Sequence, residues 1–270
     1  MYSIRLELLS SLWEASIKFG LITQARYGSS RLPGKILLEV GNQNLLSLHL
    51  QRAGKCLEKN LIKIVATTTE KEAEQICKIA EENQFLCFRG QLEDVLDRFY
   101  QAALPYDLDA IIRITSDCPL FDSKLLDSAI NLFKDKNVDY LSNTLNPTFP
   151  DGMDLEIFSM SALEMAWRNA KLKSDREHVT PYIWKNSDFH NETLFKAYSM
   201  ENNEDHSKYR LTVDSSEDYE LIKAIVSNIG INKSWQEYVS YLNDHKNLIE
   251  LNSHQTRNDG YKKSVAKDDI

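Results

Sequence analysis

Short apolar runs alternate with longer segments of mixed polar and apolar character through the first half of the chain. The runs have the length and the content of Ile, Leu, Val and Phe that are typical of buried strands, and they lie at residues 19–22, 61–66, 85–88 and 110–114. The segments between them carry helical patterns, at residues 45–53, 70–83 and 93–103. Strands that alternate with helices predict an α/β fold with a mainly parallel central sheet covered on both faces.

In a sheet of this kind, ligands bind beyond the carboxyl ends of the strands. The turns that follow these ends begin after Ile22, Ala66, Phe88 and Ile114. We therefore expect side chains in these four turns, which are far apart in the sequence, to share one rim of the sheet.

The pattern becomes less regular after Asp122. The elements expected there are a helix to about residue 134, strands near 138–141 and 155–158 with a Pro-containing loop between them, and helices near 161–171 and 175–186. Ser174 and Glu177 have the spacing of a capping box at the start of the last helix. The break in the strand–helix alternation predicts a region at about 138–210 that shapes the substrate site and a dimer contact.

One more strand and one more helix are expected after this region. Residues 211–214 form a short apolar stretch that predicts a strand, and Ser215 or Ser216 is expected to cap the helix that follows. Acidic residues at positions 217 and 218 favour the start of that helix.

The patterns divide the chain into three parts. Residues 18–250 are expected to form one domain, and residues 1–17 an N-terminal extension whose structure the sequence leaves open. Residues 251–270 are polar and lack periodicity, which predicts a flexible tail.

The composition is that of a globular protein able to bury a full core, with 270 residues of which 42% are hydrophobic. The formal net charge of -8 disfavours non-specific attraction to nucleic acid or to an anionic membrane, so neither is expected as a partner. No apolar run approaches the length of a membrane span, and the N-terminal segment lacks the uninterrupted apolar core of a signal peptide.

The cysteines also bear on location. Cys56, Cys77, Cys87 and Cys118 form no C-x-x-C pair and lack the density of a secreted disulfide framework. They are predicted to be reduced thiols in a cytoplasmic protein.

A Gly-rich basic loop directly follows the first predicted strand. It has the sequence Q-A-R-Y-G-S-S-R-L-P-G-K and runs from residue 24 to residue 35. Gly28, Ser29 and Ser30 offer N–H and hydroxyl donors, while Arg26 and Lys35 supply charge at the two ends. Groups arranged in this way can surround a polyphosphate, and the alternative is an ordinary basic turn.

Two better-known phosphate loops are excluded by the spacing. A P-loop requires four residues between its glycines and a hydroxyl after the lysine, but five residues separate Gly28 from Gly34, and Ile36 follows Lys35. The G-x-G-x-x-G pattern of dinucleotide-binding loops is absent as well.

Two aspartates follow predicted strands. Asp117 comes shortly after the strand at 110–114, and Asp214 ends the one at 211–214. Carboxylates at such positions are suited to hold Mg²⁺ while phosphates supply further oxygen ligands. Each alone is equally well explained as a turn or helix-cap residue, but two together favour the metal site.

These motifs together resemble those of the cytidylyltransferases, most closely the spore-coat polysaccharide branch and more distantly CMP-Kdo and CMP-sialic acid synthetases. Five elements occur in the family's order: R-Y-G-S-S-R-L-P-G-K at 26–35, T-S-D-C-P-L at 115–120, D-G-M-D-L-E at 151–156, R-E-H-V-T-P at 176–181 and T-V-D at 212–214. The resemblance covers roughly residues 18–228 and implies a Rossmann-like nucleotidyltransferase fold related to the glycosyltransferase-A type.

The resemblance also implies roles for single residues. Arg26 and Lys35 become the clamps of the triphosphate, and Asp117 and Asp214 the ligands of Mg²⁺. The nucleotide site then comprises Gln24, Ala25, Arg26, Gly28, Ser29, Ser30, Arg31, Lys35, Thr67, Arg89, Asp94, Arg98 and Asp117. The choice of cytosine is implied by the resemblance alone.

The acceptor is expected to bind the irregular middle region. The candidate residues are Asp151, Asp154, Glu156, Arg176, Glu177 and His178, which can hydrogen-bond sugar hydroxyls or, for Arg176, a carboxylate. The alternatives are a capping role for Glu177 and local packing for His178. Tyr182 and Trp184 are expected to be packing residues.

The leading hypothesis is transfer of CMP from CTP to an acidic sugar of the nonulosonic or ulosonic type, with release of pyrophosphate, for a surface polysaccharide. A homodimer is expected from the resemblance. The rival enzyme is a nucleotidyltransferase acting on a sugar 1-phosphate or another phosphorylated or phosphonate acceptor. A non-catalytic nucleotide-binding protein is the third hypothesis.

Overall fold

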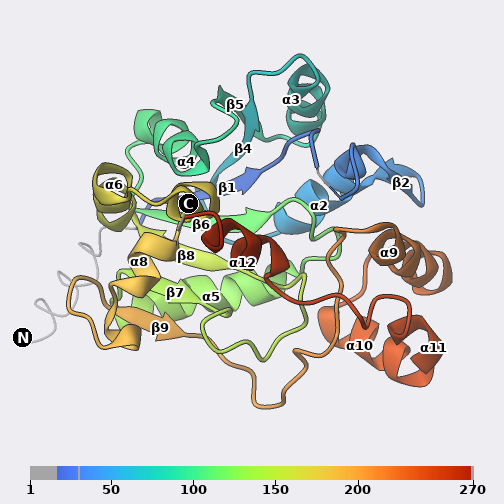
Figure 1. The fold of residues 1–270 in the computed structure, drawn as a ribbon. Helices are drawn as coiled ribbons and strands as arrows, with labels where there is room; N and C mark the ends of the chain where they lie inside the picture. The colour runs from blue at the N-terminus through green and yellow to red at the C-terminus, as the bar shows by residue number, and fades with distance from the viewer. Residues whose placement is uncertain (1–16, 30, 269–270) are drawn as a thin grey trace, which may run out of the picture.

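The apolar runs of the first half form the centre of one mixed sheet. The computed structural model describes residues 17–29 and 31–268 and contains a seven-stranded sheet in the order β5-β4-β1-β6-β8-β7-β9 (Figure 1). Its strands are β1 (Phe19–Gln24), β4 (Ile62–Thr68), β5 (Leu86–Gly90), β6 (Ala110–Thr115), β7 (Tyr140–Ser142), β8 (Glu156–Ser159) and β9 (Ala197–Ser199). A separate hairpin joins β2 (Glu39–Val40) to β3 (Gln43–Asn44).

The strands formed by the four apolar runs, β1, β4, β5 and β6, are parallel, as predicted. β1 pairs with both β4 and β6, and Gln24 lies opposite Ala66 in one register and Thr115 in the other. β5 continues the parallel arrangement beyond β4, whereas β8 pairs antiparallel with β6 and β7. The carboxyl ends of the parallel strands therefore meet at one rim.

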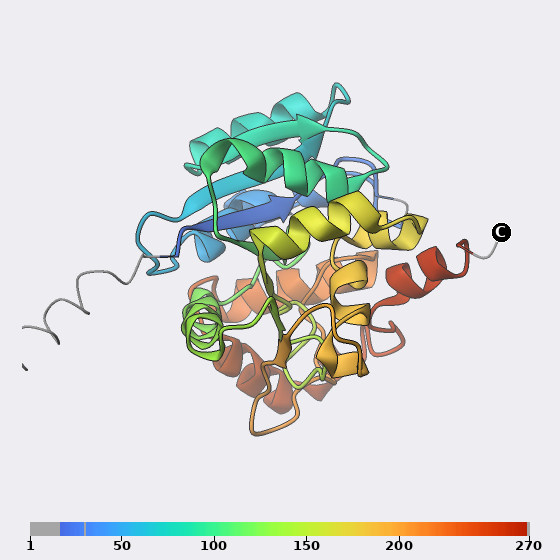
Figure 2. The same ribbon diagram turned by 90° about the vertical axis from the view of Figure 1, so that its left-hand side faces the viewer.

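Helices cover both faces of this sheet (Figure 2). Successive strand residues point to opposite faces, so Leu21 packs into one core and Ile22 into the other. The first core is closed by α2 (Leu45–Ala53), α3 (Ala73–Glu82), α5 (Ser123–Lys136), α9 (Ser216–Ile229) and α10 (Trp235–Asp244). The second is closed by α4 (Val95–Ala103), α6 (Met160–Asn169) and α8 (Pro181–Lys185).

The predicted helix at 175–186 is two helices, α7 (Lys173–His178) and α8. The break is at Val179, which has a φ of 74°, and Pro181 begins the second helix. Ser174 is buried inside α7 instead of capping it, because α7 starts at Lys173, two residues before the predicted start at 175.

The predicted strand at 211–214 is also wrong. Only Arg210 forms an isolated bridge, with Asp151, and Val213 N donates to the carbonyl of Asp117 at 2.8 Å. The stretch is apolar because it is buried beneath the rim, and it makes single contacts with two loops instead of a ladder with one strand. Ser215 caps α9 through a capping box with Asp218, in agreement with the sequence.

The C-terminal part contains more helix than the patterns predicted. α10 starts with a second capping box, Ser234 with Glu237, and is followed by α11 (Lys246–Ile249). The expected flexible tail is corrected over residues 251–268, which include α12 (Asp259–Val265) and two buried polar residues, Asn252 and Ser264. Of the expected N-terminal extension, residues 1–16 lie outside the described residues.

The cysteine prediction is corrected for one pair. Cys77 in α3 and Cys87 in β5 form a disulfide, with their Cα atoms 5.2 Å apart, whereas Cys56 and Cys118 are free. The pair forms because α3 packs on the edge strand β5. Their spacing in the sequence matched no known disulfide pattern.

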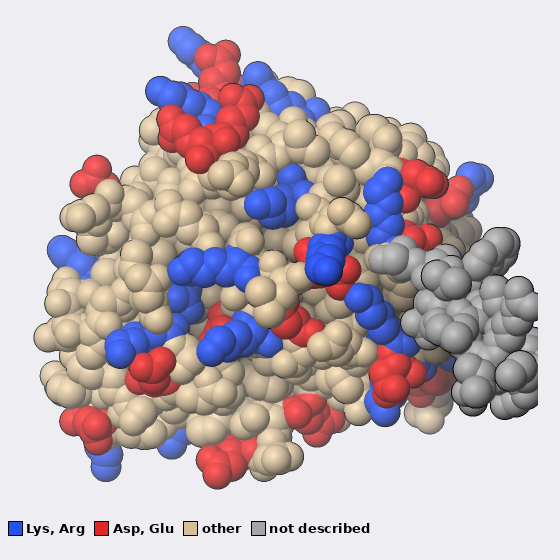
Figure 3. All heavy atoms as spheres, turned by 180° about the vertical axis from the view of Figure 1, so that it is seen from behind, with Lys and Arg blue, Asp and Glu red and all other residues tan. Residues whose placement is uncertain are grey.

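The surface mixes charges of both signs. Seen from behind, Lys and Arg side chains lie among Asp and Glu side chains rather than in separate areas (Figure 3). Within residues 17–29 and 31–268, no helix is both long enough and apolar enough to cross a membrane.

Candidate active site

The basic loop leaves β1 at the rim and folds back on itself. The carbonyl of Tyr27 accepts from the N–H groups of Ser29 and Gly34, at 3.0 and 2.9 Å. Gly34 has a φ of 70°, and the Tyr27 ring lies 3.2 Å from where a Cβ would be, so a larger residue is disfavoured there. Arg26 and Gly28 are exposed at the top of the loop, and Ser30 lies outside the described residues.

Lys35 lies between the two predicted metal ligands. Its Nζ is 2.9 Å from Asp117 Oδ2 and 2.8 Å from Asp214 Oδ1, and it donates to the Val213 carbonyl at 2.8 Å. Burial alone would lower the pKa of Lys35, but the two carboxylates outweigh it and raise that pKa. The sequence therefore predicted the convergence of these three residues, but not that the lysine would pair with the carboxylates.

Asp117 and Asp214 fit an Mg²⁺ site as a pair. Both carboxylates and the Val213 carbonyl approach one point, now held by the Lys35 ammonium, and all three are hard oxygen donors of the kind that Mg²⁺ prefers. Among the described residues, no group of three or more His, Cys, Asp or Glu side chains has an arrangement that could hold a metal ion by itself. A metal held here would thus take its remaining ligands from phosphates and water.

Arg210 connects this pair to the middle region. It donates to Asp151 at 2.5 Å, to Asp214 at 2.9 Å and to Asp218 at 2.9 Å, and its side chain is 8% exposed. Burial by itself lowers the pKa of Arg210, but the three carboxylates raise it overall. Arg31 reaches the same Asp214 at 3.0 Å.

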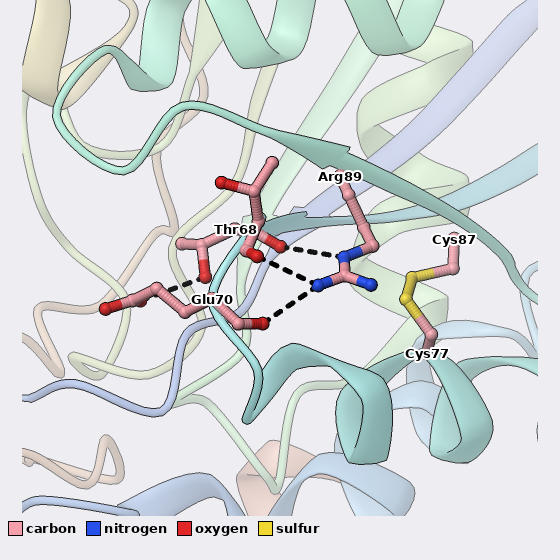
Figure 4. Close-up of a disulfide and its surroundings, with 6 residues drawn as sticks. Thr68, Glu70, Cys77, Cys87 and Arg89 are labelled. Carbon is pink, nitrogen blue, oxygen red and sulfur yellow. Dashed lines mark hydrogen bonds between the residues drawn. A yellow bond between two sulfur atoms is a disulfide. The ribbon is translucent and has the colours of Figure 1, made fainter.

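The candidate base-binding residues Arg89 and Arg98 donate hydrogen bonds to the backbone of nearby loops. Arg89 donates to the carbonyls of Thr68, Thr69 and Glu70 at 3.2, 3.0 and 2.9 Å, two residues after the disulfide at Cys87 (Figure 4). Arg98 is buried and donates to the carbonyls of Gln91 and Leu92, and burial lowers its pKa to about 10. Both arginines hold loop backbone in place, Arg98 from a buried position and Arg89 from an exposed one.

Thr67 and Asp94 complete that set. Thr67 is fully buried at the end of β4, and its hydroxyl has no hydrogen-bond partner among the described residues. Asp94 caps α4 by accepting from the Asp97 N–H at 2.9 Å, and it also pairs with Arg176 at 2.7 Å. Asp94 and Arg176, predicted to bind nucleotide and acceptor respectively, are thus partners of each other.

The carboxylates of the middle region are buried or partly buried, and each pairs with an arginine. Glu156 pairs with Arg113 and accepts from the Tyr140 hydroxyl at 2.6 Å. Asp154 pairs with Arg257, yet burial dominates and raises its pKa to about 7. Burial also raises the pKa of Asp151, which contacts Arg210.

Glu177 and His178 lie at the end of α7. Glu177 accepts from the Ser264 hydroxyl at 2.5 Å and has no role in a cap. His178 Nε2 is buried without a hydrogen-bond partner among the described residues, and burial, helped by Arg113, lowers the pKa of this imidazole to about 4. The alternative that His178 is a packing residue is supported in part, because the centre of its ring lies 5.1 Å from the centre of the Tyr261 ring.

One cavity of about 490 Å³ contains the metal-binding pair and part of the acceptor set. Among the described residues of the predicted nucleotide site, Gln24, Arg31 and Asp117 line it, whereas the two clamps, Arg26 and Lys35, do not. Its wall includes Asp117 and Asp214 from the metal-binding pair and Asp151, Asp154, Glu156 and His178 from the acceptor set. Arg89, Asp94 and Arg98 lie outside it. Trp184, predicted to be a packing residue, also lines the cavity, whereas Tyr182 packs against Phe195.

Sequence reasoning missed three residues of this wall, Arg113, Arg210 and Tyr261, and also Arg257, which pairs with Asp154 of the wall. Arg113 offered a signal, because it is a cation inside an otherwise apolar strand. Arg210 precedes Asp214 and Asp218 by four and eight residues, the spacing of an ion-paired cluster. The contacts of Arg257 and Tyr261 are with distant residues, and nothing local indicated them.

Known proteins resemble this chain along most of its length. A family model of cytidylyltransferases matches residues 21–251. The chain is 38% identical to protein MJ1063 of Methanocaldococcus jannaschii, over 86% of this chain and 93% of that protein. It is 36% identical to the spore coat polysaccharide biosynthesis protein SpsF of Bacillus subtilis, over 77% of this chain and 86% of that protein.

A solved cytidylyltransferase structure from Leptospira borgpetersenii superposes with a TM-score of 0.80 at 37% identity, covering 89% of this chain and 98% of that chain. Matches to 3-deoxy-manno-octulosonate cytidylyltransferases are weaker, at 26–31% identity over 42–48% of this chain. A CMP-Kdo synthetase structure shares the nucleotidyltransferase fold, with a TM-score of 0.57 at 15% identity. The family model matches most of the chain, and the relatives are covered along most of their length, so the chain belongs to the cytidylyltransferase family.

Proposed function

We propose that this enzyme transfers CMP from CTP to a small acidic sugar of the 2-keto type and releases pyrophosphate, for a surface polysaccharide. The observation that carries the proposal is the single cavity of about 490 Å³, which joins Asp117 and Asp214 to the buried polar groups of the middle region. Donor and acceptor can therefore bind side by side, which a direct transfer requires.

The chain's own residues orient the reactants. The basic loop surrounds the triphosphate with backbone N–H groups, while Arg26 and Lys35 supply positive charge that is stabilising as charge develops on the leaving pyrophosphate. Lys35 pairs with Asp117 and Asp214 in the structure, so its ammonium would have to turn from them to the phosphates when the carboxylates hold a metal ion. Bound Mg²⁺, for which these carboxylates are the proposed ligands, would neutralise phosphate charge and lower the pKa of the attacking hydroxyl.

The transfer needs no covalent enzyme intermediate. The acceptor hydroxyl oxygen forms a bond to the α-phosphorus in line with the bond to the β-phosphate, which breaks and leaves its electron pair on pyrophosphate. The hydroxyl proton passes to solvent. Catalysis then depends on alignment and charge, which agrees with a site rich in paired arginines and carboxylates.

The acidic acceptor is supported by three arginines on the cavity wall, Arg31, Arg113 and Arg210. All three already pair with carboxylates of the chain, and Arg31, at 34%, is the most exposed of them. An acceptor carboxylate would therefore join or replace a partner of Arg31. Two of the enzymes that resemble this chain in sequence or fold, named above, act on or make CMP derivatives of a 2-keto sugar acid.

Pyrophosphate release tests the proposal. Each of the four ribonucleoside triphosphates, with Mg²⁺, is combined with 2-keto sugar acids and with sugar 1-phosphates. Turnover is expected with CTP and a sugar acid. Turnover only with a sugar 1-phosphate would overturn the acceptor, turnover only with another nucleotide would overturn the donor, and CTP binding without any turnover would favour the non-catalytic hypothesis.

The homodimer and the cytoplasmic location stay predictions. Light scattering that gives the mass of one chain, 31.1 kDa, would remove the dimer. Cell fractionation that finds the protein outside the cytoplasm would contradict the predicted cytoplasmic location.

A further inference from the structure

The C-terminal segment, residues 252–268, contributes part of the wall of the active-site cavity. In Figure 1 it passes from the side of α9 toward α8, with α12 lying over the sheet. Five of its residues, Thr256, Asn258, Asp259, Gly260 and Tyr261, line the same cavity as the metal-binding pair. This segment lies beyond residue 251, where the match to the family model ends.

Contacts along its length fix the segment in place. Asn252 is buried and donates to Asp218 at 2.9 Å, while Arg257 pairs with Asp154. Ser264 is also buried and donates to Glu177 at 2.5 Å. Asn252 and Arg257 therefore attach one end of the segment to aspartates near the active site, and Ser264 attaches the other end to α7. The residues between these contacts have a defined position.

The two ends of the cavity differ in chemistry. At the reacting end, Asp259 of the segment lies 3.7 Å from Arg31, which also pairs with Asp214. At the other end, the Tyr261 ring meets the rings of His178 and Trp184 edge to face, at centroid distances of 5.1 and 5.9 Å. Pro181 and Phe189 line the cavity near these rings.

The charge near the aromatic end is already neutralised. Lys185 Nζ lies 5.8 Å from the Tyr261 ring centre but pairs with Asp175 at 2.6 Å. An aromatic corner without a free charge binds C–H groups and methyl groups better than it binds a second anionic group. The acceptor must therefore be polar at the end that reacts and apolar at the end that Tyr261 covers.

We propose that residues 252–268 form one wall of the acceptor site, and that Tyr261 determines specificity by selecting acceptors with an apolar substituent remote from the reacting hydroxyl. The inference deepens the proposed function and rests on it for the identity of the reaction. The proposal that residues 252–268 form a wall of the cavity can be tested without measuring turnover.

Two substitutions in the full-length chain distinguish an effect of the Tyr261 side chain from a general effect on α12. Tyr261→Ala removes the ring, whereas Tyr261→Phe retains it. Lys262→Ala is the matched control, because Lys262 is exposed on the same helix and does not line the cavity. A general effect on α12 would appear in all three variants.

The first measurement needs no acceptor. Diethyl pyrocarbonate acylates neutral imidazole nitrogens, and His178 Nε2 is buried beside Tyr261 without a partner among the described residues. Peptide mass spectrometry should show faster labelling of His178 in Tyr261→Ala than in the wild-type chain, with wild-type rates in Tyr261→Phe and Lys262→Ala. Equal labelling rates of His178 in Tyr261→Ala and Lys262→Ala would overturn the proposal that this segment forms a wall of the site. This outcome does not depend on whether the enzyme turns over any sugar.

The second measurement tests selectivity with two probes, N-acetylneuraminate, which carries an acetyl methyl group, and 3-deoxy-manno-octulosonate, which does not. The ratio of their kcat/KM values should favour the first in the wild-type chain, and Tyr261→Ala should reduce that ratio about tenfold. KM for CTP should stay unchanged. An unchanged ratio would overturn the role of Tyr261 in specificity. If the wild-type chain turns over neither probe, the result counts against the proposed function. The labelling experiment would then be the test of whether residues 252–268 form a wall of the site.

Discussion

The Lys35 ammonium lies 2.9 Å from the carboxylate of Asp117, although 82 positions separate the two residues in the chain. Asp214 completes the cluster from the other side, and the three side chains are between 12% and 24% exposed. The lysine is thus both a phosphate clamp by position and the counter-ion of two partly buried carboxylates. Loss of its charge should therefore affect stability as well as catalysis.

Lys35→Met should lower kcat about 10²–10³-fold, since it removes a charge that is stabilising in the transition state. It should also destabilise the fold by about 2–3 kcal/mol, because two carboxylates lose a partner that sits in a partly buried site. Urea unfolding and pyrophosphate release measure the two effects. Lys223→Met, at an exposed position of α9, is the control.

The same variant tests the metal site. Mg²⁺ should raise the Tm of Lys35→Met more than that of the wild-type chain, because the cation can take the place of the ammonium between Asp117 and Asp214. Equal shifts in both proteins would argue against these two carboxylates as ligands.

A second ion pair joins two residues that the sequence assigned to different substrates. Arg176 contacts Asp94 at 2.7 Å and also donates to the carbonyls of Trp167 and Ala170, both at 3.1 Å. A double-mutant cycle of Arg176→Ala and Asp94→Ala should give a coupling energy of about 1–2 kcal/mol in urea unfolding. Arg168→Ala, which breaks an exposed pair with Glu164, should cost about 0.5 kcal/mol or less.

If Arg176 instead binds the acceptor carboxylate, the coupling energy will be near zero. Arg176→Lys will then raise KM for the acceptor with no change in the urea midpoint.

The sequence predicted those features that depend on local pattern. The parallel strands were found because each apolar run can be recognised from its own residues, although β5, at the edge of the sheet, is only partly buried. Asp117 was placed at the rim because it follows such a run. The stretch at 211–214 shows the limit of this reasoning. It is as apolar as a strand, yet it is buried by contacts with the loops at Asp117 and Asp151.

The rest depended on contacts between residues far apart in the chain. Arg257 meets Asp154, 103 positions away, and Ser264 meets Glu177, 87 positions away, so a polar segment without periodicity is held in place. The disulfide depends in the same way on the packing of α3 against β5. Propensity and spacing carry no information on such pairings.

The disulfide predicts a redox-dependent stability. It closes a loop with a sequence separation of 10 residues, so its loss should cost about 2–3 kcal/mol. Dithiothreitol should lower the Tm of the wild-type chain and leave that of the Cys77→Ser, Cys87→Ser double variant unchanged. Cys56→Ser should respond to the reductant as the wild-type chain does, and a wild-type Tm that dithiothreitol does not change would contradict the bridge.

His178 predicts a pH dependence of stability. Burial and the nearby Arg113 lower the pKa of its imidazole to about 4, against an ordinary value of 6.5. Between these two values the unfolded chain binds a proton that the folded chain does not, so stability falls as the pH decreases from 6.5 to 4. The loss should reach about 3 kcal/mol, which is the free-energy equivalent of the shift.

His178→Gln removes this group without adding a charge. The difference between the unfolding free energies of the wild-type chain and the variant should be constant above pH 6.5 and should decrease steadily below it, to the disadvantage of the wild type. Urea unfolding at pH 7.5, 6, 5 and 4.5 measures the difference, and His254→Gln is the matched control because His254 is exposed. A difference that does not vary with pH would show that His178 titrates alike in both states, and the imidazole would then have to be open to water beside Tyr261.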